Sequence, residues 1–164
     1  MNETTQTPYA SPSADLVDKN SNDKIRNFKR FSAWGVFGLS MITLGIYPIY
    51  WLWTRSETIN SMQEGRIAKP LLIAMVVSTI ISTLISFIPG EDPTLLAVSG
   101  LLGIAYFVFY LMVLFKVRNS LQDIMSNGSQ ETYKLNGVYT FFANVIYLQY
   151  KINECIDSDK SAIA

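Results

Sequence analysis

Hydrophobic residues concentrate in three long stretches that contain no charged side chain. They cover residues 31–54, 70–90 and 93–115. About 20 apolar helical residues are enough to cross the ~30 Å hydrocarbon core of a bilayer. The pattern therefore predicts an all-α integral membrane protein, a small helical bundle built around a hairpin of two transmembrane helices. We expect these helices over residues 70–89 and 94–116, the second extending to about residue 126 because its helical stripe continues that far.

The first stretch, residues 31–54, is interrupted near its middle. Gly45 is a natural helix terminator, and Pro48 cannot donate to a helix hydrogen-bond ladder. Aromatic rings, which prefer the headgroup level of a membrane, follow the break at Tyr47, Tyr50, Trp51 and Trp53. Helical spacing then continues over residues 55–66, which we expect to form an amphipathic helix. The stretch is thus predicted as a broken hydrophobic helix pair that either dips into the membrane and returns or spans it with a proline kink.

The distribution of basic residues distinguishes these alternatives. They flank the hydrophobic stretches at Lys24, Arg26, Lys29, Arg30, Arg55, Arg66, Lys69, Lys116, Arg118 and Lys134. The short loop between the second and third stretches holds Glu91 and Asp92 and no basic residue. Cytoplasmic loops carry the excess of Lys and Arg. A dip places every basic group in the cytoplasm, whereas a full span exposes one group outside, so the charges favour the dip and a cytoplasmic N-terminus.

Small residues recur along both helices of the predicted hairpin. In the first helix they are Ala74, Ser78, Ser82 and Ser86, and in the second they are Ala97, Gly100 and Gly103. Membrane helices pair where small side chains allow their backbones to approach closely. We therefore expect the two stripes to face each other. The alternative is that the hydroxyl groups line a polar path for a solute.

A fourth apolar segment, residues 135–150, is uncharged but only sixteen residues long, which is short for a span. We therefore expect an interfacial or short membrane helix over residues 136–156. Asn144, Gln149 and Asn153 interrupt it, and we expect their amides to bond to neighbouring helices rather than to a ligand. Its Ile146-Tyr147-x-x-Tyr150 run weakly repeats Ile49-Tyr50-x-x-Trp53. Paired broken segments of this kind mark the binding sites of some repeat-built transporters.

The two ends of the chain are predicted to lie outside the membrane domain. Residues 1–30 contain Pro8, Pro12 and many Ser, Thr and Asn residues, with few large apolar side chains. Such a composition cannot offset the entropy of ordering, so we expect a disordered polar cytoplasmic tail. Residues 157–164 are predicted as a short C-terminal tail.

Composition narrows the classes of function. The chain has 13 basic and 13 acidic residues, which gives no sign of a nucleic-acid partner. It has no His and a single Cys, so we expect neither a metal nor a cofactor. The hydrophobic stretches hold no ionisable group of the kind that marks proton relays and pumps. With 164 residues the chain has no room for a separate catalytic domain, and a non-enzymatic protein is predicted.

Two motifs resemble those of one family. The run from Leu39 to Trp53, LSMITLGIYPIYWLW, is similar to the ITLGIYxxYWLY motif of the prokaryotic membrane family catalogued as domain of unknown function 4234. The closing run from Ile146 to Asn153 resembles that family's YLQxxxN signature. Pro48 departs from the Gly that is more usual there. Membership implies a multi-helix protein of the bacterial cytoplasmic membrane, and it implies no activity.

These features support two hypotheses of function. The first is a small membrane subunit or adaptor that acts through helix packing. Its predicted partners are the lipid bilayer and either another protein or a second copy of this chain. The alternative is a small oligomeric transporter or channel. The candidate interaction site combines irregular backbone, aromatic rings and polar groups, and consists of Gly45, Tyr47, Tyr50, Trp51, Trp53, Arg55, Asn60, Gln149 and Asn153.

Overall fold

The computed structural model describes residues 24–88, 92–126 and 133–161, and within them the chain forms helices and no strand. The helices are α2 (Ala33–Ile42), α3 (Ile46–Met62), α4 (Lys69–Ser86), α5 (Pro93–Ser126) and α6 (Gly137–Ser161). The predicted all-helical fold class is confirmed. Of these helices, α4 and α5 are long and apolar enough to cross a membrane.

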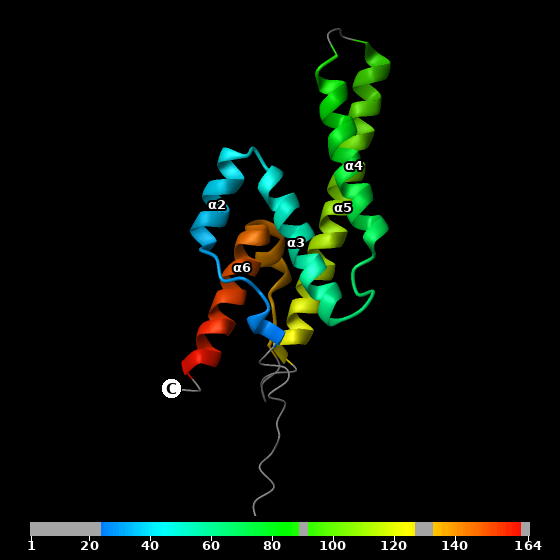
Figure 1. Ribbon diagram of the computed structural model, residues 1–164. Coiled ribbons are helices and arrows are strands. Elements are labelled where there is room, and N and C mark those ends of the chain that lie inside the picture. The colour runs from blue at the N-terminus through cyan, green and yellow to red at the C-terminus, as the bar shows by residue number, and fades with distance from the viewer. Residues whose placement is uncertain (1–23, 89–91, 127–132, 162–164) are drawn as a thin grey trace, which may run out of the picture.

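The α4–α5 hairpin stands clear of the other helices, which gather around the lower half of α5 (Figure 1). The 18 residues of α4 span ~27 Å and the 34 residues of α5 span ~51 Å. Helix α5 therefore continues well beyond α4, and α3 and α6 pack against this extension. Helices α2 and α3 form a second, shorter hairpin whose turn points the same way as the tip of α4–α5 (Figure 1).

The predicted break in the first stretch lies between α2 and α3, at residues 43–45. Leu44 and Gly45 both have positive φ, of 50° and 90°. The Thr43 hydroxyl donates to Leu39 O at 2.7 Å and accepts from Tyr47 N at 2.9 Å. Pro48 does not make the break, because it lies in the first turn of α3, where a missing N–H is tolerated. Since α3 runs to Met62, the expected division between residues 54 and 55 is not a structural boundary.

A second break divides α6. Asn144 has φ 54° and ψ −139°, and the helix reverses its direction there (Figure 1). The side-chain oxygen of Asn144 accepts a hydrogen bond from Tyr110 of α5 at 2.5 Å and another from Val145 N at 2.8 Å. The segment predicted as one short helix over residues 136–156 is thus two half-helices. The second half extends to Ser161, so residues 157–161 are not a tail.

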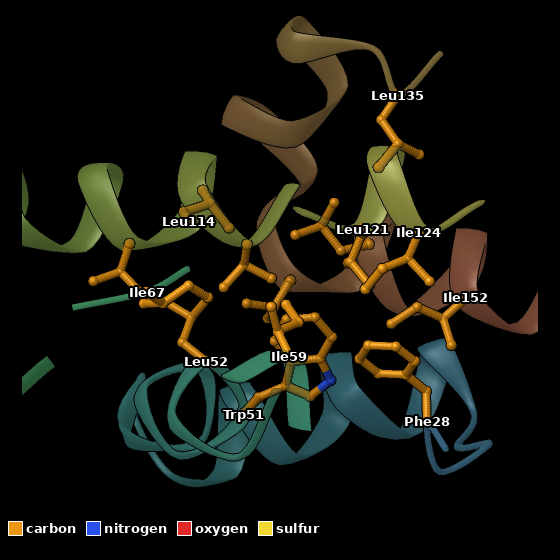
Figure 2. Packing of buried hydrophobic residues seen from close by; sticks show 14 of the residues in the cluster. Phe28, Trp51, Leu52, Ile59, Ile67, Leu114, Leu121, Ile124, Leu135 and Ile152 are labelled. Atoms are coloured by element: carbon orange, nitrogen blue, oxygen red, sulfur yellow. The ribbon is translucent and has the colours of Figure 1, made fainter. Parts of the chain in front are cut away.

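The hydrophobic core lies at the end of the molecule away from the hairpin tip. It is built from α3, the lower part of α5 and α6, and Figure 2 shows Phe28 pointing into the same cluster as Trp51, Ile124 and Ile152. Ile25 and Phe28 are each only 2% exposed. The expectation of a disordered tail is therefore wrong for residues 24–30, and residues 1–23 lie outside the described part of the chain.

The small-residue stripes of the hairpin do not face each other. On α4, Ser78 is buried, but on α5 Ala97 and Gly100 are exposed. A Cβ added at Gly100 or Gly103 would meet no heavy atom within 4 Å. The α5 stripe therefore lies away from α4. The predicted pairing of the stripes is wrong because helical spacing identifies one face of a helix but not the neighbour that this face meets.

Because the backbone at Gly45 is left-handed, a methyl group added at this position should lower the stability of the protein. Gly45→Ala should lower the free energy of unfolding by about 1–2 kcal/mol, because a Cβ is strained at positive φ. Gly100→Ala is the matched control, since its added Cβ meets open space in a regular helix and should not lower stability. Denaturant unfolding of the purified protein in detergent, followed by circular dichroism, measures both. Equal losses for the two variants would contradict the prediction.

Candidate functional site

A buried arginine joins two helices at the centre of the bundle. Arg55 of α3 is only 8% exposed. Its Nη2 donates to the side-chain oxygen of Gln149 and to the backbone carbonyl of Lys29, both at 2.9 Å. The indole Nε1 of Trp51 donates to the same Gln149 oxygen at 2.9 Å. One fully buried amide of α6 therefore accepts two hydrogen bonds from α3.

The chain of contacts continues beyond Gln149 to the segment before α2. The Gln149 Nε2 donates to Asn153 Oδ1 at 2.9 Å, and Asn153 Nδ2 donates to the carbonyl of Phe31 at 2.7 Å. Trp51 and Arg55 are four residues apart on α3, as Gln149 and Asn153 are on α6, so each pair lies on one helix face. We call these four side chains the polar chain. It binds α3, α6 and residues 29–31 to one another.

The positive charge of Arg55 is stabilised by the dipoles of neutral groups. Among the described residues its hydrogen-bond partners are a backbone carbonyl and an amide oxygen, and its Cζ lies 5.4 Å from the centroid of the Trp51 ring. Burial lowers the pKa of Arg55, but a guanidinium remains protonated in proteins. The Arg55 Nε is buried without a hydrogen-bond partner. Removing either acceptor would leave a charge in a dry environment, which is costly.

The remaining residues of the predicted site lie outside the polar chain. Tyr47 packs against the rings of Phe31 and Tyr50, and Trp53 donates to the exposed carboxylate of Glu57 at 3.0 Å. Asn60 holds the loop before α4, because its amide exchanges two hydrogen bonds with the backbone of Ile67, at 2.8 and 2.9 Å. Gly45 forms the turn between α2 and α3. The structure therefore joins Trp51, Arg55, Gln149 and Asn153 by hydrogen bonds, and the other five residues of the predicted site are not part of that chain.

Some anchoring residues were not predicted. Arg118 donates to the carbonyl of Leu135, and Gln122 Oε1 accepts from Leu135 N at 3.1 Å, so both hold the start of α6 on α5. Tyr110 meets Asn144 at the second break. A tyrosine in an otherwise apolar stretch is a usable signal, since a buried hydroxyl needs a partner. The contacts to the carbonyls of Lys29 and Phe31 leave no side-chain signal in the sequence.

The polar chain can position helices, but its chemistry is limited. None of its side chains is a carboxylate, imidazole, thiol or hydroxyl, so it supplies no nucleophile or general base near neutral pH. Among residues 24–88, 92–126 and 133–161, no group of three or more His, Cys, Asp or Glu side chains could hold a metal ion. The geometry is that of a structural junction between the helices.

The chain belongs to the family described as a domain of unknown function, DUF4234, whose sequence model matches residues 31–158. The match covers both motifs that the sequence resemblance rested on, and the predicted family membership is confirmed. It contains helices α2 to α5, most of α6 and all four side chains of the polar chain. No curated protein and no solved structure matches the chain.

Gln149 should be more important for stability than its position on an apolar helix suggests. Gln149→Leu removes the acceptor of both Arg55 and Trp51 and should lower the free energy of unfolding by about 3 kcal/mol. Gln63→Leu is the matched control, because the buried Oε1 of Gln63 has no hydrogen-bond partner to lose. The measurement is denaturant unfolding in detergent.

A double variant separates the cost of the buried charge from the loss of packing. Arg55→Met combined with Gln149→Leu should be more stable than the sum of the single effects implies, because no unpaired cation remains. Strictly additive losses would show that the contact between the two side chains is not what stabilises the junction.

Proposed function

We propose that this protein is embedded in a membrane through the α4–α5 hairpin. Within the apolar window of each of these helices only 17% of the residues are buried, whereas the core helix of a soluble protein is mostly buried. The exposed side chains of the hairpin are large and apolar, and include Ile73, Val77, Ile80, Leu84, Leu96, Leu101, Ile104, Phe107 and Met112. A soluble monomer rarely exposes so continuous an apolar surface, which lipid would cover.

In this proposal the α2–α3 turn and the break within α6 also dip into the same membrane and return. The α2–α3 turn exposes Met41, Ile42, Leu44 and Ile46, and the first half of α6 exposes Val138 and Phe142. Both of these turns point the same way as the hairpin tip, and the segment before α2 and the α3–α4 loop, which carry basic residues, lie toward the opposite end (Figure 1). This arrangement favours a multi-pass protein of the bacterial cytoplasmic membrane with its N-terminus in the cytoplasm.

The function that we propose is that of a non-enzymatic membrane subunit or adaptor. The observation that carries it is the open face of α5, where Gly100 and Ala97 are exposed on a helix that no other described helix covers on that side. Small residues of this kind let a partner helix approach closely in lipid. The bundle below, held by the polar chain, would keep that face at a fixed position relative to the membrane surface.

A second candidate is a small oligomeric transporter or channel. It is favoured by the two positive-φ breaks, at Gly45 and Asn144, since paired broken helices often form transport sites. The hydroxyl groups of α4 do not support a transporter or channel. Thr79 donates to Met75 O at 2.9 Å and Ser86 donates to Ser82 O at 2.9 Å, so these groups bond to their own helix instead of offering a polar path.

Cysteine labelling tests the membrane placement. In a Cys155→Ser background, single cysteines are introduced as Lys29→Cys, Ser61→Cys or Thr94→Cys, all at exposed positions. A membrane-impermeant thiol reagent added to intact cells should label only the Thr94→Cys variant, because Lys29 and Ser61 face the cytoplasm. Permeabilised cells should show labelling of all three. Opposite behaviour of Lys29→Cys and Ser61→Cys would mean that the first stretch crosses the membrane.

Site-specific photo-crosslinking tests the adaptor function. A photoreactive side chain at Ala97 should give an adduct with a different protein in native membranes, whereas one at the exposed Ile80 of α4 should not. Gly100→Leu should abolish the adduct while the monomer stays folded, because an added Cβ at this position meets no heavy atom within 4 Å. An adduct with a second copy would favour the oligomeric alternative. Adducts with lipid alone would contradict the proposed partner.

A further inference from the structure

A groove of about 990 Å³ lies between the first turn of α2 and the second half of α6. Its lining combines charged, polar and aromatic side chains, chiefly Arg30, Ser32, Trp34, Tyr150, Glu154 and Asp157. Asn153, the last member of the polar chain, also lines it. Because Asn153 is bonded to Gln149 and to the Phe31 carbonyl, that part of the groove is held in place by the bundle itself.

The groove lies where the apolar and charged surfaces of the molecule meet. Trp34 is 81% exposed at its rim, and the exposed apolar surface of α2 continues from there to Leu44. Tyr150 is exposed at the rim as well. Aromatic rings in this setting prefer the headgroup level of a bilayer. With the membrane placement proposed above, on which this inference rests, the groove opens at the level of the cytoplasmic headgroups.

The charges in the groove have both signs. Arg30 Nη2 contacts Asp157 Oδ2 at 2.8 Å, and both side chains are about half exposed. Glu154 contacts Lys151 at 2.7 Å and is also partly exposed. Each acid is thus paired with a base at the surface, where such pairs are weak and open to additional partners. The lining of the groove itself holds one base and two acids, a balance that does not favour an anionic ligand.

Donors and acceptors lie side by side within the groove, since Arg30 and Asp157 are in contact. Arg30 has five N–H donors, and the described contacts use its Nη2 alone. The Ser32 oxygen accepts from Gly35 N at 3.4 Å, which leaves its hydroxyl proton free to donate. Glu154 and Asp157 provide carboxylate acceptors one helical turn away from each other on α6. An anion fits beside Arg30 and Ser32, and an N–H-bearing cation fits beside the two acids.

We propose that this groove binds the headgroup of a zwitterionic phospholipid that carries a primary ammonium, namely phosphoethanolamine. Its phosphate accepts hydrogen bonds from Arg30 and Ser32, its ammonium donates to Glu154 and Asp157, and its acyl chains run along Trp34 and α2. A phosphocholine headgroup has no N–H to donate. A phosphoglycerol headgroup has no cation, and the two carboxylates repel its charge.

Lipid retention by the full-length protein tests the proposal. The protein, purified in mild detergent, is mixed with equal amounts of phosphatidylethanolamine, phosphatidylcholine and phosphatidylglycerol of identical acyl chains, and bound lipid is measured by native mass spectrometry. Phosphatidylethanolamine should be retained about tenfold more than either competitor, as expected for charge-assisted hydrogen bonds. The Glu154→Gln/Asp157→Asn double variant should retain phosphatidylethanolamine and phosphatidylcholine equally.

Two further variants assign the effect to the groove. Arg30→Gln should lower the retention of both zwitterionic lipids, because it acts on the phosphate that they share. Glu57→Gln/Glu64→Gln makes the same charge change at exposed acids elsewhere and should preserve the preference. Circular dichroism confirms that each variant is folded.

Equal retention of the three lipids, a preference for phosphatidylglycerol, or loss of the preference in the control variant would overturn the proposal. The lipids in detergent report on headgroup chemistry alone, whereas cysteine labelling reports on membrane placement, so the failure of one is distinguishable from the failure of the other.

Discussion

The bundle depends on the contact between Arg55 and Gln149. A buried guanidinium destabilises a fold unless hydrogen-bond acceptors are held in position around it. Here that role falls on one amide oxygen, which also accepts from Trp51, and on the carbonyl of Lys29. The contact therefore couples the register of α3 to that of α6 and orders the segment before α2. Apolar packing alone would tolerate a slip of either helix, whereas this junction does not.

The two halves of the molecule are held together by different forces. Around the polar chain, burial is almost complete and hydrogen bonds specify which residues meet, as for Gln149 with Asn153. In the α4–α5 hairpin, only the facing sides of the helices are covered, and the hydroxyls of Thr79 and Ser86 bond to their own helix. Such a hairpin gains little from water exclusion on its outer side. It is stable where lipid or another helix provides that surface, which is why its exposure points to the membrane.

Sequence patterns predicted where the helices lie better than they predicted which surfaces pack together. The glycine signal located the first break at Gly45, and the combination of irregular backbone, aromatic rings and polar groups singled out Arg55 and Gln149. The pairing of the Gly100 stripe with α4 failed, because periodicity defines a face without defining what covers it. The ordering of Phe28 was missed, since a single aromatic residue in a polar segment has no periodicity. The break at Asn144 was missed as well, because asparagine adopts a positive φ only in some contexts.

Both backbone breaks follow one rule, which explains where they occur. A reversal of the chain frees N–H and C=O groups. In the membrane placement proposed above, lipid cannot satisfy these groups, so they need partners from the protein. Thr43 supplies them at the first break, by bonding to Leu39 O and Tyr47 N. Asn144 supplies them at the second, where its side chain accepts from Val145 N and from Tyr110. Short polar side chains next to the turn, rather than the proline, therefore determine where each hydrophobic segment turns back.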